Sequence, residues 1–215
     1  DNGIVGDVEA AGTAPGTRID VLSLFAKVPA RLSFQRRPST ETAAIVDVGV
    51  QMALAEPNAG ILIEVDGRKV LDCPPTESAE DRLYDLFGST SSELIPLTSS
   101  QADSDAPGGE KWTGWISPPG LNRSRADDVH ILVNGRPVSP GPFLQSVRRG
   151  YHTRLMVGRH PIGVLLLSLP ADEVDVNVHP TKREVRLKNS WRVLERLERS
   201  IKHTLSQIAT RPEAS

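Results

Sequence analysis

The feature that most constrains the fold is a strand, a helix and a second strand that follow one another in the last third of the chain. Residues 129–138, "VHILVNGRPV", read as two short strands that turn at or near Asn134 and Gly135. Residues 142–158 carry apolar side chains at helical spacing, and residues 163–169, "GVLLLSL", are typical of a buried strand. Strands joined by a helical crossover run parallel in one sheet. The sequence therefore predicts an α/β (α+β) fold with a partly parallel sheet.

The first half of the chain reads as a strand followed by a helix. Residues 16–25 place apolar side chains on both faces of an expected strand, so we expect both faces to be covered. Residues 38–58 predict a helix that Ser39 or Thr40 caps. One side of this helix carries Ile45, Val48, Met52 and Ala55.

A hairpin and a boundary come next. Asp66 and Gly67 supply the positive φ angles of a two-residue turn inside residues 61–73. Pro74 and Pro75 break the pattern, which predicts domains at residues 1–76 and 77–215. Beyond the boundary we expect a short helix over residues 77–88, with Ser78 and Asp81 at capping spacing, and an amphipathic helix over residues 190–208 that docks on the sheet.

Charge is unevenly distributed although the formal net charge is only -2. Residues 136–203 hold 13 Lys and Arg against 6 Asp and Glu, which leaves 12 against 21 elsewhere. A basic segment of this kind permits contact with phosphates, and a solvated helix face explains part of it equally well. The candidate DNA-binding residues are Arg148, Arg149 and Arg154, on or near the polar side of the helix at residues 142–158.

Composition removes several classes of function. The only cysteine is Cys73, so an intrachain disulfide is impossible, and we expect its thiol to serve in packing. No apolar run approaches the roughly 18 residues of a membrane span, so we expect no contact with a membrane. The histidines lack a paired-ligand spacing, and no metal site is expected.

The stretch "DVNVHPTKREVRL", residues 175–187, contains a lysine, Lys182, on an expected turn. Alternation predicts a strand up to His179, after which Pro180 ends the ladder and the chain turns at Thr181 and Lys182. By pattern alone, Lys182 is either ordinary solvated surface or a ligand contact. We interpret His179 as structural, because no Ser or Cys nucleophile is identifiable near it.

Three segments together carry a family resemblance: "GTRIDVLSLFAKVPAR", "VHILVNGRPV" and "DVNVHPTKREVRL". In this order and at these separations they resemble the MutL family of DNA mismatch repair proteins, within the GHKL (Bergerat-type) ATPases. The resemblance implies that residues 1–76 are the C-terminal portion of a GHKL ATPase domain. Residues 77–215 are then a transducer domain similar to domain 2 of ribosomal protein S5. Gly16 and Thr17 match the last nucleotide-site motif. Lys182 matches the lysine that reaches the γ-phosphate of ATP, so the resemblance makes it the candidate catalytic and cofactor-binding residue.

The resemblance also implies a function. It is that of an ATP-dependent matchmaker, which couples mismatch recognition to strand removal. The implied cofactor is ATP with Mg²⁺ in the full-length protein. The adenine, Mg²⁺ and general-base motifs lie upstream in the family, so no nucleotide is expected on this chain alone and no hydrolysis by it. The implied partners are DNA, a mismatch recognition protein of MutS type, and a second copy in a homodimer formed through the N-terminal region when ATP is bound. The implied location is the cytoplasm, with the nucleoid, if the source is bacterial.

Some positions depart from the family pattern. Lys27 stands where "LF-x-N-x-PAR" has asparagine, and Ser33 stands where a basic residue is common. Pro140 and Gly141 replace a basic position after "NGR". In "DNGIVG", residues 1–6, the second glycine comes one residue late for the Asp-x-Gly-x-Gly nucleotide motif, which favours a simple turn.

Two further hypotheses remain open. The chain could be a nucleotide-independent nucleic-acid-binding or scaffold module with an S5-like fold, or a transducer from a type II topoisomerase or Hsp90-like relative. The sequence upstream of Asp1 discriminates the first of these from the ATPase reading, because only the ATPase needs a helix with Glu and Asn followed by Asp-x-Gly-x-Gly.

Overall fold

A computed structural model describes residues 7, 12, 15–23, 25–98, 109–175 and 184–209. The chain forms two compact units, residues 1–45 and 46–215. Helix α2 (Pro38–Ala55) begins in the first unit and continues into the second. This division concerns packing within the chain, and the domain boundary expected at residues 76 and 77 stays a prediction.

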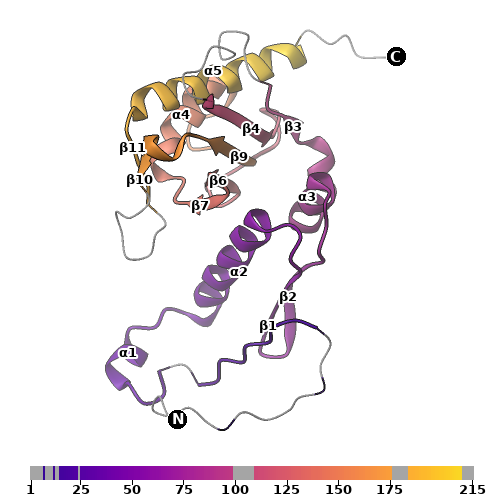
Figure 1. Ribbon diagram of the computed structural model, residues 1–215, viewed down its shortest axis with the longest axis vertical. Helices are drawn as coiled ribbons and strands as arrows, with labels where there is room; N and C mark the ends of the chain where they lie inside the picture. The colour runs from indigo at the N-terminus through magenta and orange to yellow at the C-terminus, as the bar shows by residue number, and fades with distance from the viewer. Residues whose placement is uncertain are drawn as a thin grey trace. The chain divides into compact units, whose positions relative to one another are not determined.

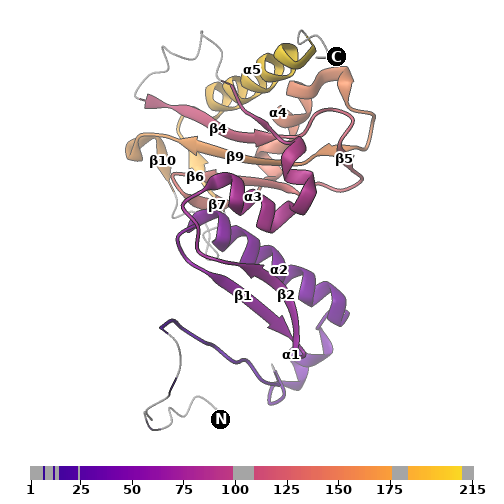
Figure 2. The same ribbon diagram turned by 90° about the vertical axis from the view of Figure 1, so that its right-hand side faces the viewer.

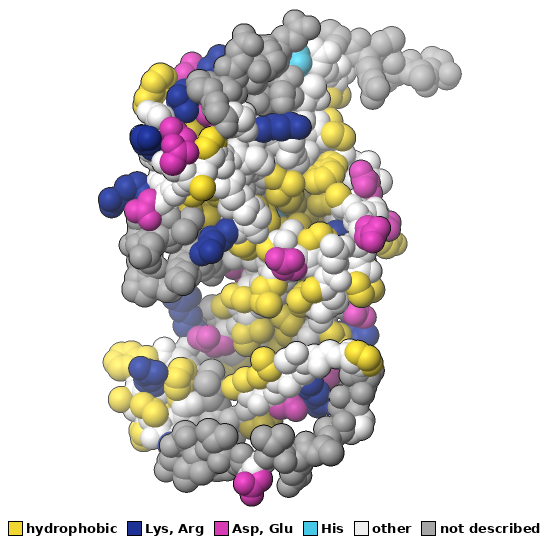
Figure 3. Space-filling view, viewed as in Figure 1, with side chains coloured by type: hydrophobic (Ala, Val, Ile, Leu, Met, Phe, Trp, Pro, Cys, Tyr) yellow, Lys and Arg dark blue, Asp and Glu magenta, His cyan; other side chains and the backbone are white. Residues whose placement is uncertain are grey.

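The described part of the first unit contains helix α1 (Pro29–Ser33) and the start of α2 but no strand. The predicted strand over residues 16–25 is therefore wrong, and its two faces are not covered: Ile19 is 81% exposed and Leu22 84%. A strand needs a neighbour for its backbone N–H and C=O groups, and no described residue of this unit offers one. Hydrophobic side chains also lie at the surface around α1, as Figure 3 shows, and Phe34 is 87% exposed.

Strands β1 (Ile61–Val65) and β2 (Arg68–Cys73) form an antiparallel hairpin, which confirms the predicted one. Its turn residues, Asp66 and Gly67, have φ angles of 50° and 72°, the left-handed values that a two-residue hairpin turn needs. Cys73 ends the second strand with only 1% of its surface exposed, so the packing role expected of it is confirmed.

Helix α2 packs on this hairpin through small side chains. A Cβ added at Gly49 would lie 2.4 Å from Cδ1 of Ile63, and Ala53 is fully buried. The side of the helix predicted to be apolar instead faces solvent, since Val48 is 46% exposed and Met52 53%. Both sides of the helix are apolar, and the hairpin packs closely only against the side whose residues, Gly49 and Ala53, are also small. The helix begins at Pro38, so Ser39 and Thr40 lie inside its first turn and neither is the N-cap.

Helix α3 (Ala79–Phe87) has the predicted ends. The Ser78 hydroxyl accepts a hydrogen bond of 3.0 Å from the Asp81 backbone N–H, which satisfies one of the free donors of the first turn. Gly88, with a φ of 57°, closes the helix and begins the 3₁₀ helix η1 (Gly88–Glu93).

The central sheet has five strands in the order β3-β4-β9-β6-β7. They are β3 (Ile95–Pro96), β4 (Lys111–Ile116), β9 (Gly163–Ser168), β6 (Val129–Val133) and β7 (Arg136–Val138). Strands β6 and β9 run parallel, with Val129 opposite Gly163, and helix α4 (Gly141–Tyr151) lies between them in the chain. The parallel crossover that the sequence predicts is confirmed, as is the turn at Asn134 and Gly135.

Helices cover both faces of this sheet (Figure 1). On one face, α4 and α5 (Ser190–Ala209) bury Trp112, Ile131 and Leu165. On the other face, residues of α3 and the end of α2 pack against Leu132 and Val164. The turned view in Figure 2 shows α3 over this face of the sheet. The amphipathic helix predicted over residues 190–208 is confirmed: Val193, Leu197, Ile201 and Leu205 of α5 are buried, whereas Ile208 near its end is 37% exposed.

Short elements complete the second unit. They are β5 (Asn122–Arg123), the 3₁₀ helix η4 (His152–Arg154), β8 (His160–Pro161), the 3₁₀ helix η5 (Ala171–Glu173), β10 (Val174–Asp175) and β11 (Arg186–Leu187). Strands β5 and β8 pair with each other, and so do β10 and β11.

Candidate functional site

The predicted catalytic residue, Lys182, lies outside the described residues, as do His179 and residues 1–6. The two strands that flank this segment are described. Strand β10 pairs antiparallel with β11, with Val174 opposite Leu187 and Asp175 opposite Arg186. Both Val174 and Leu187 pack against the main hydrophobic core. The chain therefore enters and leaves the Lys182 segment at two neighbouring strands that are attached to the core.

Glu173 ties these two strands together just below their ladder. Its backbone carbonyl accepts a hydrogen bond of 2.9 Å from the Lys188 N–H. Its carboxylate accepts another, of 3.0 Å, from the side-chain amide of Asn189. Lys188 and Arg192 each bring a cationic nitrogen to 3.8 Å from the same carboxylate. One acidic side chain therefore holds the end of η5, the exit of β11 and the start of α5.

A buried carboxylate lies beside this contact. The side chain of Glu110 is fully buried, and its oxygens lie 3.4 Å from Nε of Arg192 and 3.5 Å from Nε of Arg196. Removing a carboxylate from water is costly unless cations compensate it, and both arginines, four residues apart on α5, supply that charge. Arg192 contacts both Glu110 and Glu173, so it links the start of β4 to the strands that flank Lys182.

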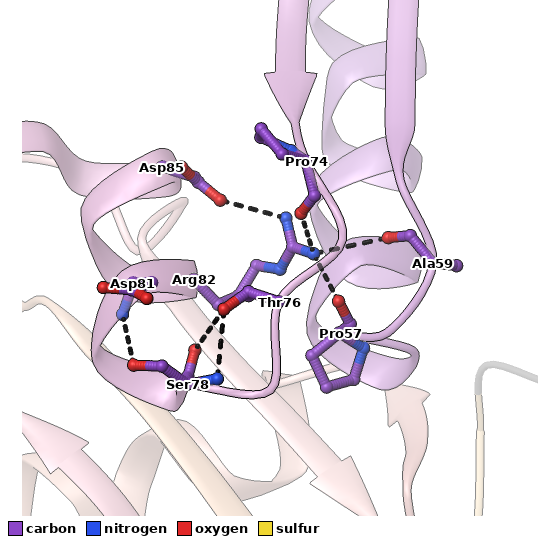
Figure 4. A network of polar contacts seen from close by, with 8 residues as sticks. All are labelled: Pro57, Ala59, Pro74, Thr76, Ser78, Asp81, Arg82 and Asp85. Carbon is purple, nitrogen blue, oxygen red and sulfur yellow. Dashed lines mark hydrogen bonds and ion pairs between the residues drawn. The ribbon is translucent and has the colours of Figure 1, made fainter.

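A buried cation, Arg82, lies between α3 and the end of the hairpin (Figure 4). Only 2% of Arg82 is exposed. Its Nη2 donates to the carbonyls of Pro57 at 2.7 Å, Pro74 at 2.8 Å and Ala59 at 3.3 Å, and its Nη1 lies 3.2 Å from the Asp85 carboxylate. The guanidinium thus joins the loop after α2, the end of β2 and helix α3. No sequence pattern pointed to Arg82. For Glu110, the sequence offered one indirect indication: Arg192 and Arg196 are four residues apart, so on a helix they can share an acidic partner.

Gly16 and Thr17, the predicted nucleotide contacts, belong to the first unit, and both are exposed. Gly16 has a φ of +149°, which side-chain-bearing residues rarely adopt, and nothing lies within 4 Å of the position of an added Cβ. The backbone at this point is therefore open to close approach. Lys27 is exposed in the same unit, and the Ser33 hydroxyl bonds the carbonyl of Ala30 at 2.8 Å.

The predicted DNA-binding residues lie in the second unit. Arg148 and Arg149 occupy the last turn of α4, and Arg154 lies in η4. All three are exposed, and none forms an ion pair with a described residue. The structure brings these three together along one segment. Over β10, β11 and the start of α5, by contrast, Lys and Arg alternate with Asp and Glu, as Figure 3 shows.

Among the described residues, no three or more His, Cys, Asp or Glu side chains gather in a way that could hold a metal ion. No helix in this part of the chain is long and apolar enough to cross a membrane.

Comparison with known proteins identifies the family. A family model described as the C-terminal domain of DNA mismatch repair proteins matches residues 83–206, more than half of the chain. The chain belongs to this family of DNA mismatch repair proteins. The match spans the sheet, α4, β10, β11 and nearly all of α5, so it includes the segment around Lys182.

Curated relatives agree with this assignment over most of the chain. The DNA mismatch repair protein MutL of Sphingopyxis alaskensis is 41% identical over 88% of this chain and 30% of its own length. The MutL of Geotalea uraniireducens is 34% identical over 100% of this chain and 36% of its own length. The chain thus spans about a third of the length of the relatives it matches.

Solved structures share the fold. The N-terminal domain of a DNA repair protein has a TM-score of 0.69 at 22% identity and covers 86% of this chain and 59% of its own. The Aquifex aeolicus MutL ATPase domain complexed with ADP has a TM-score of 0.51 at 19% identity, over 69% of this chain and 50% of its own. The predicted fold class, α/β (α+β), is confirmed.

Proposed function

We propose that the chain is part of an ATP-dependent mismatch repair protein of MutL type, a matchmaker that couples mismatch recognition to strand removal. The observation that carries this proposal is its match to curated MutL proteins at 34–41% identity over 88–100% of its length. Within this function, Lys182 is the residue that senses the γ-phosphate of ATP. Residues 1–76 are the end of the ATPase domain, and residues 77–215 are the transducer.

The role of Lys182 has a physical basis. Phosphoryl transfer is catalysed mainly by positioning and by stabilising charge on the γ-phosphate oxygens, so a lysine supplied by a second domain is sensitive to whether that phosphate is present. Loss of the phosphate then releases one contact between domains, which couples hydrolysis to movement. The pairing of β10 with β11 and the Glu173 contacts support this role, because they restrict where the ends of the Lys182 segment lie.

Gly16 and Thr17 are the nucleotide contacts of the ATPase part. The open backbone at Gly16 fits a phosphate, since a bound oxygen can approach the peptide N–H groups without meeting a side chain. ATP with Mg²⁺ is the cofactor of the full-length protein. By the family resemblance, the motif that holds the metal lies upstream of Asp1.

DNA is the proposed macromolecular ligand, bound through Arg148, Arg149 and Arg154. Their lack of ion-pair partners among the described residues supports this, because an unpaired exposed arginine is ready to replace counterions along a phosphate backbone. The proposed protein partners are a mismatch recognition protein of MutS type and a second copy of the chain, in a homodimer formed through the N-terminal region when ATP is bound. The proposed location is the cytoplasm, associated with the nucleoid if the source is bacterial.

The test of Lys182 is the substitution Lys182→Ala in the full-length protein. Loss of a charge-assisted contact with the γ-phosphate removes roughly 1.5 to 3 kcal/mol, or about 10- to 150-fold in ATP turnover. Affinity for ADP stays nearly unchanged, because ADP lacks this phosphate. The thermal midpoint also stays nearly unchanged, because substitution of a surface lysine usually alters stability by less than about 0.5 kcal/mol.

Arg183→Ala is the matched control, because it removes a neighbouring positive charge from the same segment. We expect a much smaller loss of turnover from it. Equal losses in the two variants would mean that general charge matters rather than a specific contact. Normal turnover in Lys182→Ala would favour the nucleotide-independent module instead.

A further inference from the structure

A tight turn between α4 and β8 presents two apolar side chains to solvent. The backbone N–H of Arg159 donates to the carbonyl of Met156 at 3.1 Å, which closes a four-residue turn. Gly158, its third residue, has a φ of +77°. Met156 is 76% exposed, and Val157 is 95% exposed. Turn positions usually carry small or polar residues, so two adjacent apolar side chains at this tip call for an explanation.

The turn is held firmly on both sides. Before it, Leu155 packs against the main core. After it, Nε of Arg159 donates to the side-chain carbonyl of Asn122 at 2.6 Å, and His160 pairs with Arg123 in the β5–β8 ladder. An apolar tip with an ordered base loses little conformational entropy when it binds a partner. We name residues 156–158 the apolar tip.

Positive charge with no ion-pair partner among the described residues precedes the apolar tip. Arg154 lies two residues before Met156, and Arg148 and Arg149 lie one helical turn before η4. Acidic groups of neighbouring elements already have cations of their own. On α5, Glu195 pairs with Arg199 and Glu198 with Lys202. Next to β5, Asp128 pairs with Arg123 at 2.9 Å. Among the described residues of α4, η4 and these neighbouring elements, the three arginines are therefore the positive charges without an acidic partner.

This combination selects the chemistry of the partner. Arginines without ion-pair partners among the described residues fit a row of phosphates, and the aliphatic tip that follows them in the chain fits a surface with apolar edges behind that row. Duplex DNA offers both in its minor groove, where proteins combine basic residues with inserted Met, Leu or Ile side chains. A single-stranded nucleic acid fits less well, because it is bound by stacking on aromatic rings. The only Phe, Tyr or Trp within residues 148–159 is Tyr151, which is fully buried.

We propose that the apolar tip, through Met156 and Val157, contacts the minor groove of duplex DNA while Arg148, Arg149 and Arg154 contact the flanking phosphates. This rests on the DNA binding proposed above and adds the groove and the residues that reach it. The part of the affinity that the tip supplies does not depend on counterion release. The part that the arginines supply depends on it, and therefore on the salt concentration.

The difference in salt dependence provides the experiment. Binding of a short duplex to the full chain is measured by fluorescence anisotropy over a range of salt concentrations. The double variant Met156→Ser, Val157→Ser should bind about 10-fold more weakly, because the apolar area that the two side chains bury in the groove is lost. Its slope of log affinity against log salt should equal that of the unchanged protein. Arg148→Ala and Arg149→Ala should each reduce that slope by about 1.

A fluorescent base analogue in the duplex reports the contact directly. Its emission should rise on binding, as a base step is partly unstacked, and this rise should be absent with the double variant. Leu62→Ser is the matched control, because Leu62 is an exposed apolar residue of the hairpin, 56% exposed and far along the chain. It should leave both affinity and emission unchanged. The thermal midpoint of the double variant should stay the same, since both side chains face solvent.

Each other outcome overturns a different statement. If the arginine variants weaken binding and the double variant does not, the proposed contact of the apolar tip with the minor groove is wrong. DNA binding through the arginines then stands. If the unchanged protein has no affinity for duplex DNA, the proposed DNA function fails as well. If the double variant keeps its affinity for DNA but loses binding to phosphatidylglycerol vesicles, the partner of the tip is a lipid surface and the inference is overturned.

Discussion

At the scale of single residues, Arg82 shows how a buried cation can organise irregular backbone. A guanidinium has five N–H donors in a rigid plane, and carbonyls at the ends of secondary-structure elements lack partners. Arg82 supplies donors to such carbonyls, because its Nη2 donates hydrogen bonds to the carbonyls of Pro57, Ala59 and Pro74. Thr76 adds a second link between the same segments through its N–H, 2.9 Å from the carbonyl of Pro57.

Replacing this arginine tests its importance. Arg82→Met keeps most of the apolar volume but leaves buried carbonyls and the Asp85 carboxylate without a donor. We expect the free energy of unfolding to fall by about 3 to 5 kcal/mol, measured by urea denaturation. Arg82→Lys should recover only part of it, because an ammonium lacks the planar fork. Arg68→Met, at an exposed position of the hairpin, is the control, and a similar loss there would contradict this account.

At the scale of elements, the contact between α4 and α5 depends on a glycine. A Cβ added at Gly150 would lie 2.6 Å from Cβ of Ile201 and 3.2 Å from the carbonyl of Glu198. The two helices therefore approach more closely than any larger residue allows. This close contact completes the packing of α5 on the sheet and places its first turn beside the strands that flank Lys182.

A matched pair of glycine substitutions separates this contact from helix propensity. Gly150→Ala should lower the free energy of unfolding by about 1 to 3 kcal/mol through overpacking, although alanine is the better helix former by about 1 kcal/mol. Gly141→Ala, in the first turn of the same helix, has only the Ser139 hydroxyl within 4 Å, at 3.7 Å, and should be neutral or slightly stabilising. Denaturant unfolding compares the two. Equal effects would rule out the close approach of α4 and α5 as the cause.

At the scale of the whole molecule, burial of His130 couples folding to pH. This residue of β6 is 8% exposed, and the Phe87 ring of α3 lies 6.1 Å from its ring. Burial lowers the pKa of His130 below its ordinary value of 6.5, and the carboxylates of Asp47 and Asp128 oppose this only in part. The folded protein therefore takes up this proton less readily than the unfolded chain does.

The sign of the pH dependence follows from this difference. Below about pH 6.5 the unfolded chain binds more protons at this position, so stability falls as the pH falls. We expect the free energy of unfolding to be lower at about pH 5 than at about pH 7, and we expect His130→Gln to reduce that difference. Urea denaturation at each pH measures it. His152→Gln is the exposed control, and the idea fails if His130→Gln keeps the full pH dependence.

Local chemistry in the sequence determined the turns and the order of the elements. The hairpin at Asp66 and Gly67, the cap at Ser78 and the end of α3 at Gly88 depend on neighbouring residues alone, because φ angles and capping bonds are local. The sequence also predicted a parallel pair of strands, and β6 and β9 form it, with β7 and α4 between them in the chain. The motif around Lys182 indicated the family from the sequence alone, because its residues are consecutive.

Tertiary structure decided which surfaces are covered. Residues 16–25 carry apolar side chains on both faces as a covered strand does, yet the described part of their unit supplies no partner, and an isolated strand is not stable. Helix α2 is apolar on two sides, and only the small residues Gly49 and Ala53 allow the hairpin to approach closely. The acceptors of Arg82 and the cations of Glu110 come from segments far apart in the chain. Their charges were visible in the sequence, but burial and proximity arise only when distant segments pack together.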